Sequence, residues 1–156
     1  MKFRPAILVG LLVLPGPFCR AGFPTPFFTI ECDKMGSARV DNGKLSLGDN
    51  SINKVPDRSP APDKWYVGGS QIKSSVGGGY LAYDVSGKNP KVFVLPTPGK
   101  GTEWEIVIHR GREEHATVRA ANGPFKGWSL DGKAGQFILS AKPSGDVWVE
   151  RFYSHK

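Results

Sequence analysis

The sequence predicts a single all-β domain built from three repeats, and three observations support this prediction. The chain has 156 residues, which suits one domain because most domains contain about 100–150 residues. It holds 20 glycines and 13 prolines, and no long stretch after residue 21 lacks both, so helices are disfavoured. The apolar residues show no helical periodicity there and gather instead in short β-branched or aromatic runs.

Eleven such runs are the predicted strands. The first three, 27–32, 44–47 and 65–67, are rich in aromatic and aliphatic residues. The next four are 71–76, 80–83, 91–95 and 104–108. A glycine triplet at 77–79 connects the first two of them. The last four, 116–120, 127–130, 136–141 and 147–153, are separated by glycine-containing turns. Short strands at regular spacing indicate a barrel or a sandwich.

An internal repeat organises these strands. Three aliphatic residues open the copies and lie 42 and 46 residues apart: Ile30, Ile72 and Val118. Three tryptophans close the copies and lie 39 and 44 residues apart: Trp65, Trp104 and Trp148. We interpret these tryptophans as equivalent core positions whose indole N–H groups need buried partners. The second strand of each copy is predicted at 44–47, 80–83 and 127–130, and each ends near an aspartate that suits a turn: Asp49, Asp84 and Asp131.

Three copies of a four-strand unit resemble the β-trefoil fold. That fold has six strands in a short barrel and six in hairpins that cap its base. The copies cover approximately residues 27–69, 70–114 and 115–156, within a domain predicted at 22–156. Propeller blades have a similar period, but three blades are fewer than the about four to eight of propellers.

Residues 1–21 are similar to a secretory signal peptide. A basic start is followed by an apolar run at 6–14 and by Ala21 at the expected cleavage site. The run is shorter than the ~20 apolar residues of a membrane span, so we expect a secreted protein with no membrane association after cleavage. Cleavage would lower the formal net charge from +7 to +4 and leave Cys32 as the one cysteine. Because Cys32 continues an apolar run, we expect it to be buried.

No motif for catalysis or metal binding is present. The sequence has neither a C-x-x-C pair nor a Cys/His quartet for zinc. His109, His115 and His155 lie outside any recognisable catalytic motif, and nothing singles out Glu103 and Glu105 as an acid pair. We therefore expect a monomeric binding protein with no enzymatic activity, cofactor or metal. The secretion signal and the lack of a basic–aromatic motif also argue against nucleic-acid binding.

Saccharides and polyanions are two classes of ligand to compare with this trefoil sequence. Ricin-B-type lectins carry Gln-x-Trp on the closing strand, but here Asp63, Thr102 and Asp146 stand two residues before the tryptophans. Sugar stacking could still involve aromatic residues that also suit the core: Tyr80, Tyr83 and Trp128. A patch for polyanions could involve six cations interspersed with acidic residues, which favours an ordinary solvated surface: Arg110, Arg112, Arg119, Lys126, Lys133 and Lys142.

The segment 47–59 resembles the first repeat of fungal β-trefoil serine protease inhibitors. The phrase 91–96, followed by 103–106, resembles a second-repeat pattern of the same family. The resemblance implies a substrate-like loop that enters a protease active site. The sequence departs from the family at Asp49, where those inhibitors often have a basic residue.

Prolines support this loop independently, since Pro56, Pro60 and Pro62 restrict the backbone and lower the entropy cost of binding. Lys54 or Arg58 could enter an acidic specificity pocket. The candidate protease-binding residues are Asn50, Ser51, Ile52, Asn53, Lys54 and Arg58. The sequence thus favours a protease as partner, with a glycan as the alternative.

Overall fold

The computed structural model describes residues 27–33, 35–48, 59–109, 112–145 and 147–151. At 108–109, 112–115 and 148–151 only the backbone is described. The predicted signal peptide and the candidate protease-binding residues Asn50, Ser51, Ile52, Asn53, Lys54 and Arg58 lie outside the described residues. Secretion and protease inhibition therefore stay predictions.

Twelve strands are described, four in each repeat. The first repeat contains β1 (Phe28–Cys32), β2 (Gly36–Asp41), β3 (Lys44–Gly48) and β4 (Trp65–Gly68). The second contains β5 (Gln71–Ser74), β6 (Tyr80–Tyr83), β7 (Val92–Leu95), the short 3-10 helix η1 (Lys100–Thr102) and β8 (Trp104–His109). The third contains β9 (Arg112–Ala120), β10 (Ser129–Lys133), β11 (Gln136–Ser140) and β12 (Val147–Arg151).

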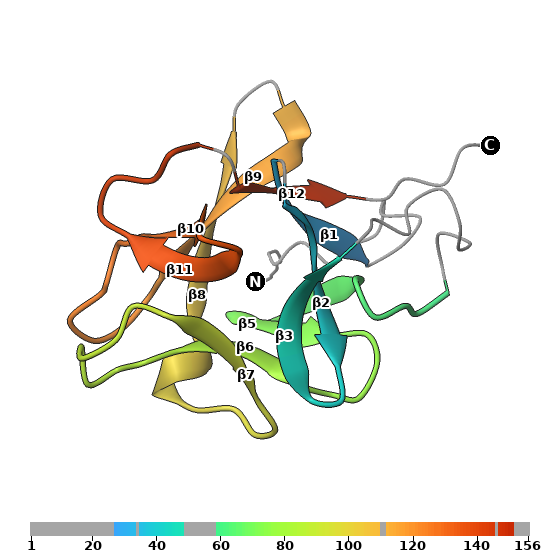
Figure 1. Ribbon diagram of the computed structural model, residues 1–156, viewed down its shortest axis with the longest axis horizontal. Helices are drawn as coiled ribbons and strands as arrows, with labels where there is room; N and C mark the ends of the chain where they lie inside the picture. The colour runs from blue at the N-terminus through green and yellow to red at the C-terminus, as the bar shows by residue number, and fades with distance from the viewer. Residues whose placement is uncertain (1–26, 34, 49–58, 110–111, 146, 152–156) are drawn as a thin grey trace, which may run out of the picture.

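Six of these strands form a closed antiparallel barrel in the order β1, β4, β5, β8, β9 and β12. The link between β5 and β8 is a bridge between Gln71 and Glu103, reinforced by a 2.8 Å hydrogen bond from the Trp104 N–H to the Ser70 carbonyl. The other six strands form the hairpins β2–β3, β6–β7 and β10–β11. Figure 1 shows the three hairpins spaced around the centre of the view.

The core confirms five of the six predicted repeat anchors, and for the sixth, Trp148, only the backbone is described. Ile30 and Ile72 are fully buried and Val118 is almost so. Trp65 and Trp104 are buried too, and their indole N–H groups donate to the Ala38 carbonyl at 3.0 Å and to the Leu81 carbonyl at 2.9 Å. Both tryptophans thus reach from a fourth strand to the second strand of the same repeat, and the polar edge of each ring is satisfied.

One strand assignment from the sequence was wrong. The second strand of the first repeat is β2, which was not predicted, and residues 44–48 form the third strand, β3. The alternation in β2 is hard to recognise because buried Ala38 and Val40 are small and buried Ser37 is polar. The counterpart of Asp84 is therefore Asp41 at the end of β2, whereas Asp49 lies outside the described residues.

The third repeat also differs from its prediction. Asp131 lies inside β10, opposite Ile138, rather than in the turn that follows. The next residue, Gly132, takes the place that Val40 and Tyr83 hold in the other repeats. A Cβ atom there would collide with the Cys32 sulfur and crowd the Met35 sulfur. Cys32 is 4% exposed, which confirms that it is buried.

Candidate functional site

Three outward-facing residues on adjacent strands form the most distinctive surface of the molecule. On β4, β5 and β6 the inward residues are Trp65, Ile72 and Leu81, so strand alternation turns their neighbours outward. Tyr66 pairs across the strands with Lys73, and Lys73 pairs with Tyr80. Directly paired residues share one face of a sheet. We call Tyr66, Lys73 and Tyr80 the Tyr–Lys–Tyr row.

The lysine of this row lies between the two aromatic rings. The Lys73 Nζ atom is 5.3 Å from the centre of the Tyr80 ring and 6.0 Å from that of Tyr66. At these distances the ring quadrupoles attract the ammonium group. All three side chains are only partly buried. Phe27 extends the aromatic surface beyond Tyr66, with ring centres 6.4 Å apart.

The charge of Lys73 is available to a ligand. Hydrogen bonding to the Tyr66 phenol is the main cause of a raised pKa at Lys73, and a lysine amine is protonated at neutral pH even at its ordinary pKa. In the part of the chain that the structure describes, no carboxylate lies within ion-pair distance of this amine. The row is thus a cation between two phenols with no internal counter-ion.

The glycine triplet at 77–79 lies between β5 and β6, which confirms the prediction that it connects two strands. Gly77 and Gly78 both have φ of +71°, a conformation that glycine adopts without strain. A Cβ atom on Gly79 would collide with Val94 on β7. A Cβ atom on Gly78 would lie 3.7 Å from the Lys73 side chain. The triplet therefore lets the chain fold tightly back into β6.

The repeat symmetry provides two equivalents of the row. At the next junction, Glu105 on β8 pairs with Arg119 on β9, which pairs with Ser129 on β10. At the third junction, Glu31 on β1 takes the place of the cation and accepts hydrogen bonds of 2.9 and 3.0 Å from Ser37 on β2. The described side chains thus place a cation between two aromatic rings at the β4–β5–β6 junction and at neither of its equivalents.

Comparisons with known proteins identify the fold. No protein-family model and no curated protein matches the sequence. Among solved structures, SeviL bound to the asialo-GM1 saccharide matches with a TM-score of 0.55 and 13% identity, over 82% of this chain and 98% of that one. A Macrolepiota procera ricin B-like lectin in complex with lactose matches with a TM-score of 0.55 and 14% identity, over 85% and 100%. The fold is a β-trefoil.

A third match is part of a larger enzyme. The endo-β-galactosidase from Clostridium perfringens that releases GlcNAcα1-4Gal matches with a TM-score of 0.56 and 18% identity. The match covers 81% of this chain but 32% of the enzyme, so the chain spans about a third of that protein. Identities this low show the shared fold alone. None of these three structures is named as a protease inhibitor.

The aromatic residues predicted for sugar stacking have three different environments in the trefoil. Tyr83 is 2% exposed, and its hydroxyl donates to the Glu103 carbonyl at 2.6 Å and accepts from the Asn122 N–H at 3.0 Å. Burial raises the pKa of Tyr83, and we assign it a structural role. Trp128 is half-buried against Phe125, with ring centres 4.8 Å apart. Tyr80 belongs to the surface row, whereas its partners Tyr66 and Lys73 were missed from the sequence.

Asp63, Thr102 and Asp146 stand where the Gln-x-Trp pattern has Gln, and the two that the structure describes lie inside the fold. Asp63 and Thr102 are buried. The Thr102 hydroxyl accepts from the Gly99 N–H at 2.8 Å and donates to the Gly99 carbonyl at 2.7 Å, so it holds the turn before β8. Asp146 lies outside the described residues.

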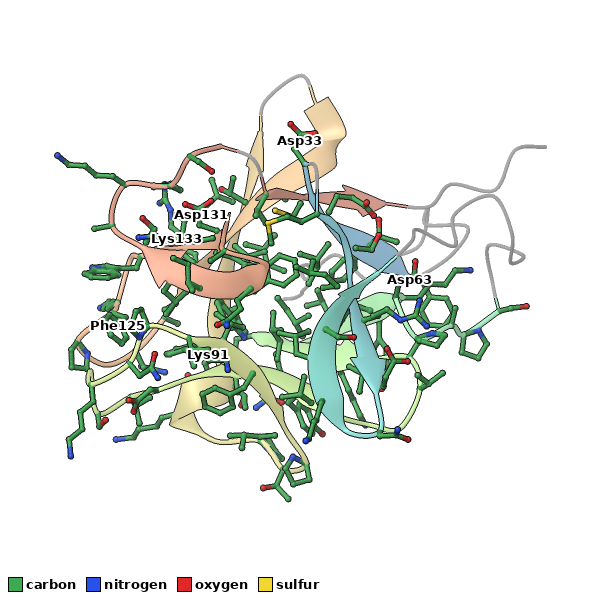
Figure 2. All side chains as sticks on the ribbon, viewed as in Figure 1. Asp33, Asp63, Lys91, Phe125, Asp131 and Lys133 are labelled. Carbon is green, nitrogen blue, oxygen red and sulfur yellow. The ribbon has the colours of Figure 1, made fainter. Side chains whose placement is uncertain are left out.

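The predicted basic residues do not form one site in the described part of the chain. Lys126, Lys133, Lys142 and Arg119 are exposed on four different segments. Figure 2 shows Lys133 beside Asp131 on the β10–β11 hairpin. Arg110 is not described, and for Arg112 only the backbone is.

No acid pair or metal cluster stands out among the described side chains. Glu105 is exposed, while the Glu103 carboxylate accepts a 3.0 Å hydrogen bond from Asn122. The described residues contain no group of three or more His, Cys, Asp or Glu side chains that could hold a metal ion. They also contain no helix of the length and hydrophobicity needed to cross a membrane.

Proposed function

We propose that this protein binds saccharides and that the Tyr–Lys–Tyr row is its binding surface. The observation that carries the proposal is the placement of two partly exposed tyrosines on either side of Lys73, on three neighbouring strands. Tyrosine offers an apolar ring and a polar hydroxyl, which suit the C–H faces and the hydroxyl groups of a sugar. The saccharide complexes of the two similar trefoils, SeviL and the Macrolepiota lectin, support the same class of ligand.

The size and rigidity of the row also support this function. Neighbouring strands lie about 4.8 Å apart, so Tyr66 and Tyr80 span roughly 10 Å, which suits one or two sugar rings. The three residues lie on barrel and hairpin strands whose inward neighbours are buried core residues, so little ordering is required when a ligand binds. We propose binding without hydrolysis, because the row offers no carboxylate pair for glycosidic cleavage.

A glycan array with multivalent display tests the proposal, because one shallow surface is expected to bind a single saccharide with a Kd of only about 0.1–1 mM. Tyr66→Ala and Tyr80→Ala should each weaken binding about tenfold, since each removes one ring from the surface. Trp128→Ala is the aromatic control in another repeat, with thermal melting to verify folding. Binding that is lost in Trp128→Ala but kept in both tyrosine variants would place the site elsewhere.

Protease inhibition through residues 50–58 is a separate prediction that rests on the sequence alone. A panel of serine proteases assayed with the wild type, Lys54→Ala and Arg58→Ala would test it. Inhibition unchanged by both substitutions would exclude these two cations as the specificity residues.

A further inference from the structure

Resting on the proposed saccharide binding, we infer that the ligand is an acidic saccharide whose carboxylate is attached directly to a sugar ring, with Lys73 as the counter-ion of that carboxylate. A saccharide that covers the row must displace water from the Lys73 ammonium group. Desolvating an ammonium group is costly unless a charged partner replaces the water. The structure provides no such partner in the described residues, so the ligand is the source of the negative charge.

The distances within the row fit a carboxylate that is attached directly to a sugar ring. A carboxylate oxygen hydrogen-bonded to an ammonium nitrogen lies about 2.8 Å from it, and the sugar ring follows one bond beyond the carboxyl carbon. The Tyr80 ring centre is 5.3 Å from the Lys73 Nζ atom, a distance within reach of a sugar ring whose carboxylate contacts this amine. A sulfate ester has one more bond between its charged group and the ring, so it holds the ring farther from Lys73.

The equivalent cation at the next junction lacks this arrangement. Arg119 pairs across the strands with Glu105, which supplies a negative charge on the same face, and with Ser129 in place of a tyrosine. A ligand carboxylate would meet Glu105 there and would find no aromatic ring on either side. The fold thus presents the same backbone geometry twice, and the two cations differ in their cross-strand partners, which are two tyrosines for Lys73 and a glutamate and a serine for Arg119.

Isothermal titration with oligogalacturonate and with its methyl ester tests the inference, because the ester keeps the sugar and removes the charge. The wild type should bind the acid about tenfold more tightly than the ester. Lys73→Met should remove this difference, since methionine keeps an apolar chain between the rings but carries no charge. Lys73→Arg should retain it, and the matched controls Arg119→Met and Lys133→Met should leave it unchanged.

Each outcome separates the two proposals. Equal binding of the acid and the ester by the wild type would overturn the acidic ligand while leaving saccharide binding in place. The absence of binding to any saccharide would overturn both. Equal losses in Lys73→Met and Lys133→Met would show general attraction to polyanions, and tighter binding of a sulfated glycan of equal length would show the wrong anion. Tighter binding of a sialylated glycan, whose carboxylate is also on the ring, would identify sialic acid rather than a hexuronic acid as the source of the carboxylate. General attraction to polyanions, or a preference for the sulfated glycan, would overturn the sugar carboxylate.

Discussion

The Tyr66–Lys73–Tyr80 row and its equivalent, Glu105–Arg119–Ser129, show how one backbone supports two different surfaces. Both rows cross three antiparallel strands with matching pairing, and both have a cation at the centre. The cation has a carboxylate beside it in the second row and phenol rings on both sides in the first. The barrel and its core therefore fix the position of the central residue, and the neighbouring strands decide which side chains lie beside its charge.

The largest expected effect comes from copying the acidic neighbour into the first row. Tyr66→Glu places a carboxylate opposite Lys73, as Glu105 lies opposite Arg119. It removes one ring, supplies an internal counter-ion and repels an anionic ligand, so we expect affinity for oligogalacturonate to fall about thirtyfold. Stability should change by less than about 1 kcal/mol, because opposite charges on paired strands interact favourably.

Titration calorimetry and thermal melting measure these two effects in the same preparation. Tyr66→Gln is the matched control, since it removes the ring without adding a charge. If both variants weaken binding equally, the ring rather than the availability of the cation distinguishes the two rows.

The sequence allowed the framework of this comparison to be predicted, but not the row itself. Ile30, Ile72 and Val118 were recognisable because large aliphatic residues at core positions recur with the repeat. β2 was missed because its buried residues are small or polar, although Asn42-Gly43 was a usable signal. Both of these residues have positive φ, as a tight two-residue hairpin requires, and they place a strand on each side.

The row was missed because its members meet only through strand register. Tyr66, Lys73 and Tyr80 are each seven residues apart in the sequence, a spacing with no meaning for a strand. Their proximity follows from two pairings, which depend on the two-residue turn after Gly68 and on the glycine triplet. The inward positions of Trp65 and Ile72 did indicate that the residue after each faces outward. Without register, that signal could not show that these outward residues are neighbours.

A smaller effect is expected when one hydroxyl is removed and both rings stay. Tyr80→Phe keeps the aromatic surface beside Lys73 but removes one donor for a sugar oxygen. The loss of a single net hydrogen bond should weaken binding about fivefold. Titration of both saccharides checks this: the acid and the ester should weaken equally, because the charge of Lys73 is unchanged. A loss confined to the acid would instead mean that the Tyr80 hydroxyl contacts the carboxylate.

The smallest expected effect is that of pH on the affinity for oligogalacturonate. This effect distinguishes Lys73 from a histidine, which titrates near neutral pH. The pKa of Lys73 is raised, chiefly by hydrogen bonding to the Tyr66 phenol, and the groups that face its amine are the phenols of Tyr66 and Tyr80. Raising this pKa keeps the amine cationic toward higher pH, so its contribution is complete at neutral pH and is lost only as the pH rises through the raised pKa. A sugar carboxylate is ionised above about pH 4–5. Affinity for oligogalacturonate, measured at constant ionic strength, should therefore change less than about twofold between pH 6 and 9. A marked fall across pH 6–7 would show that a histidine, rather than Lys73, provides the charge that the ligand requires.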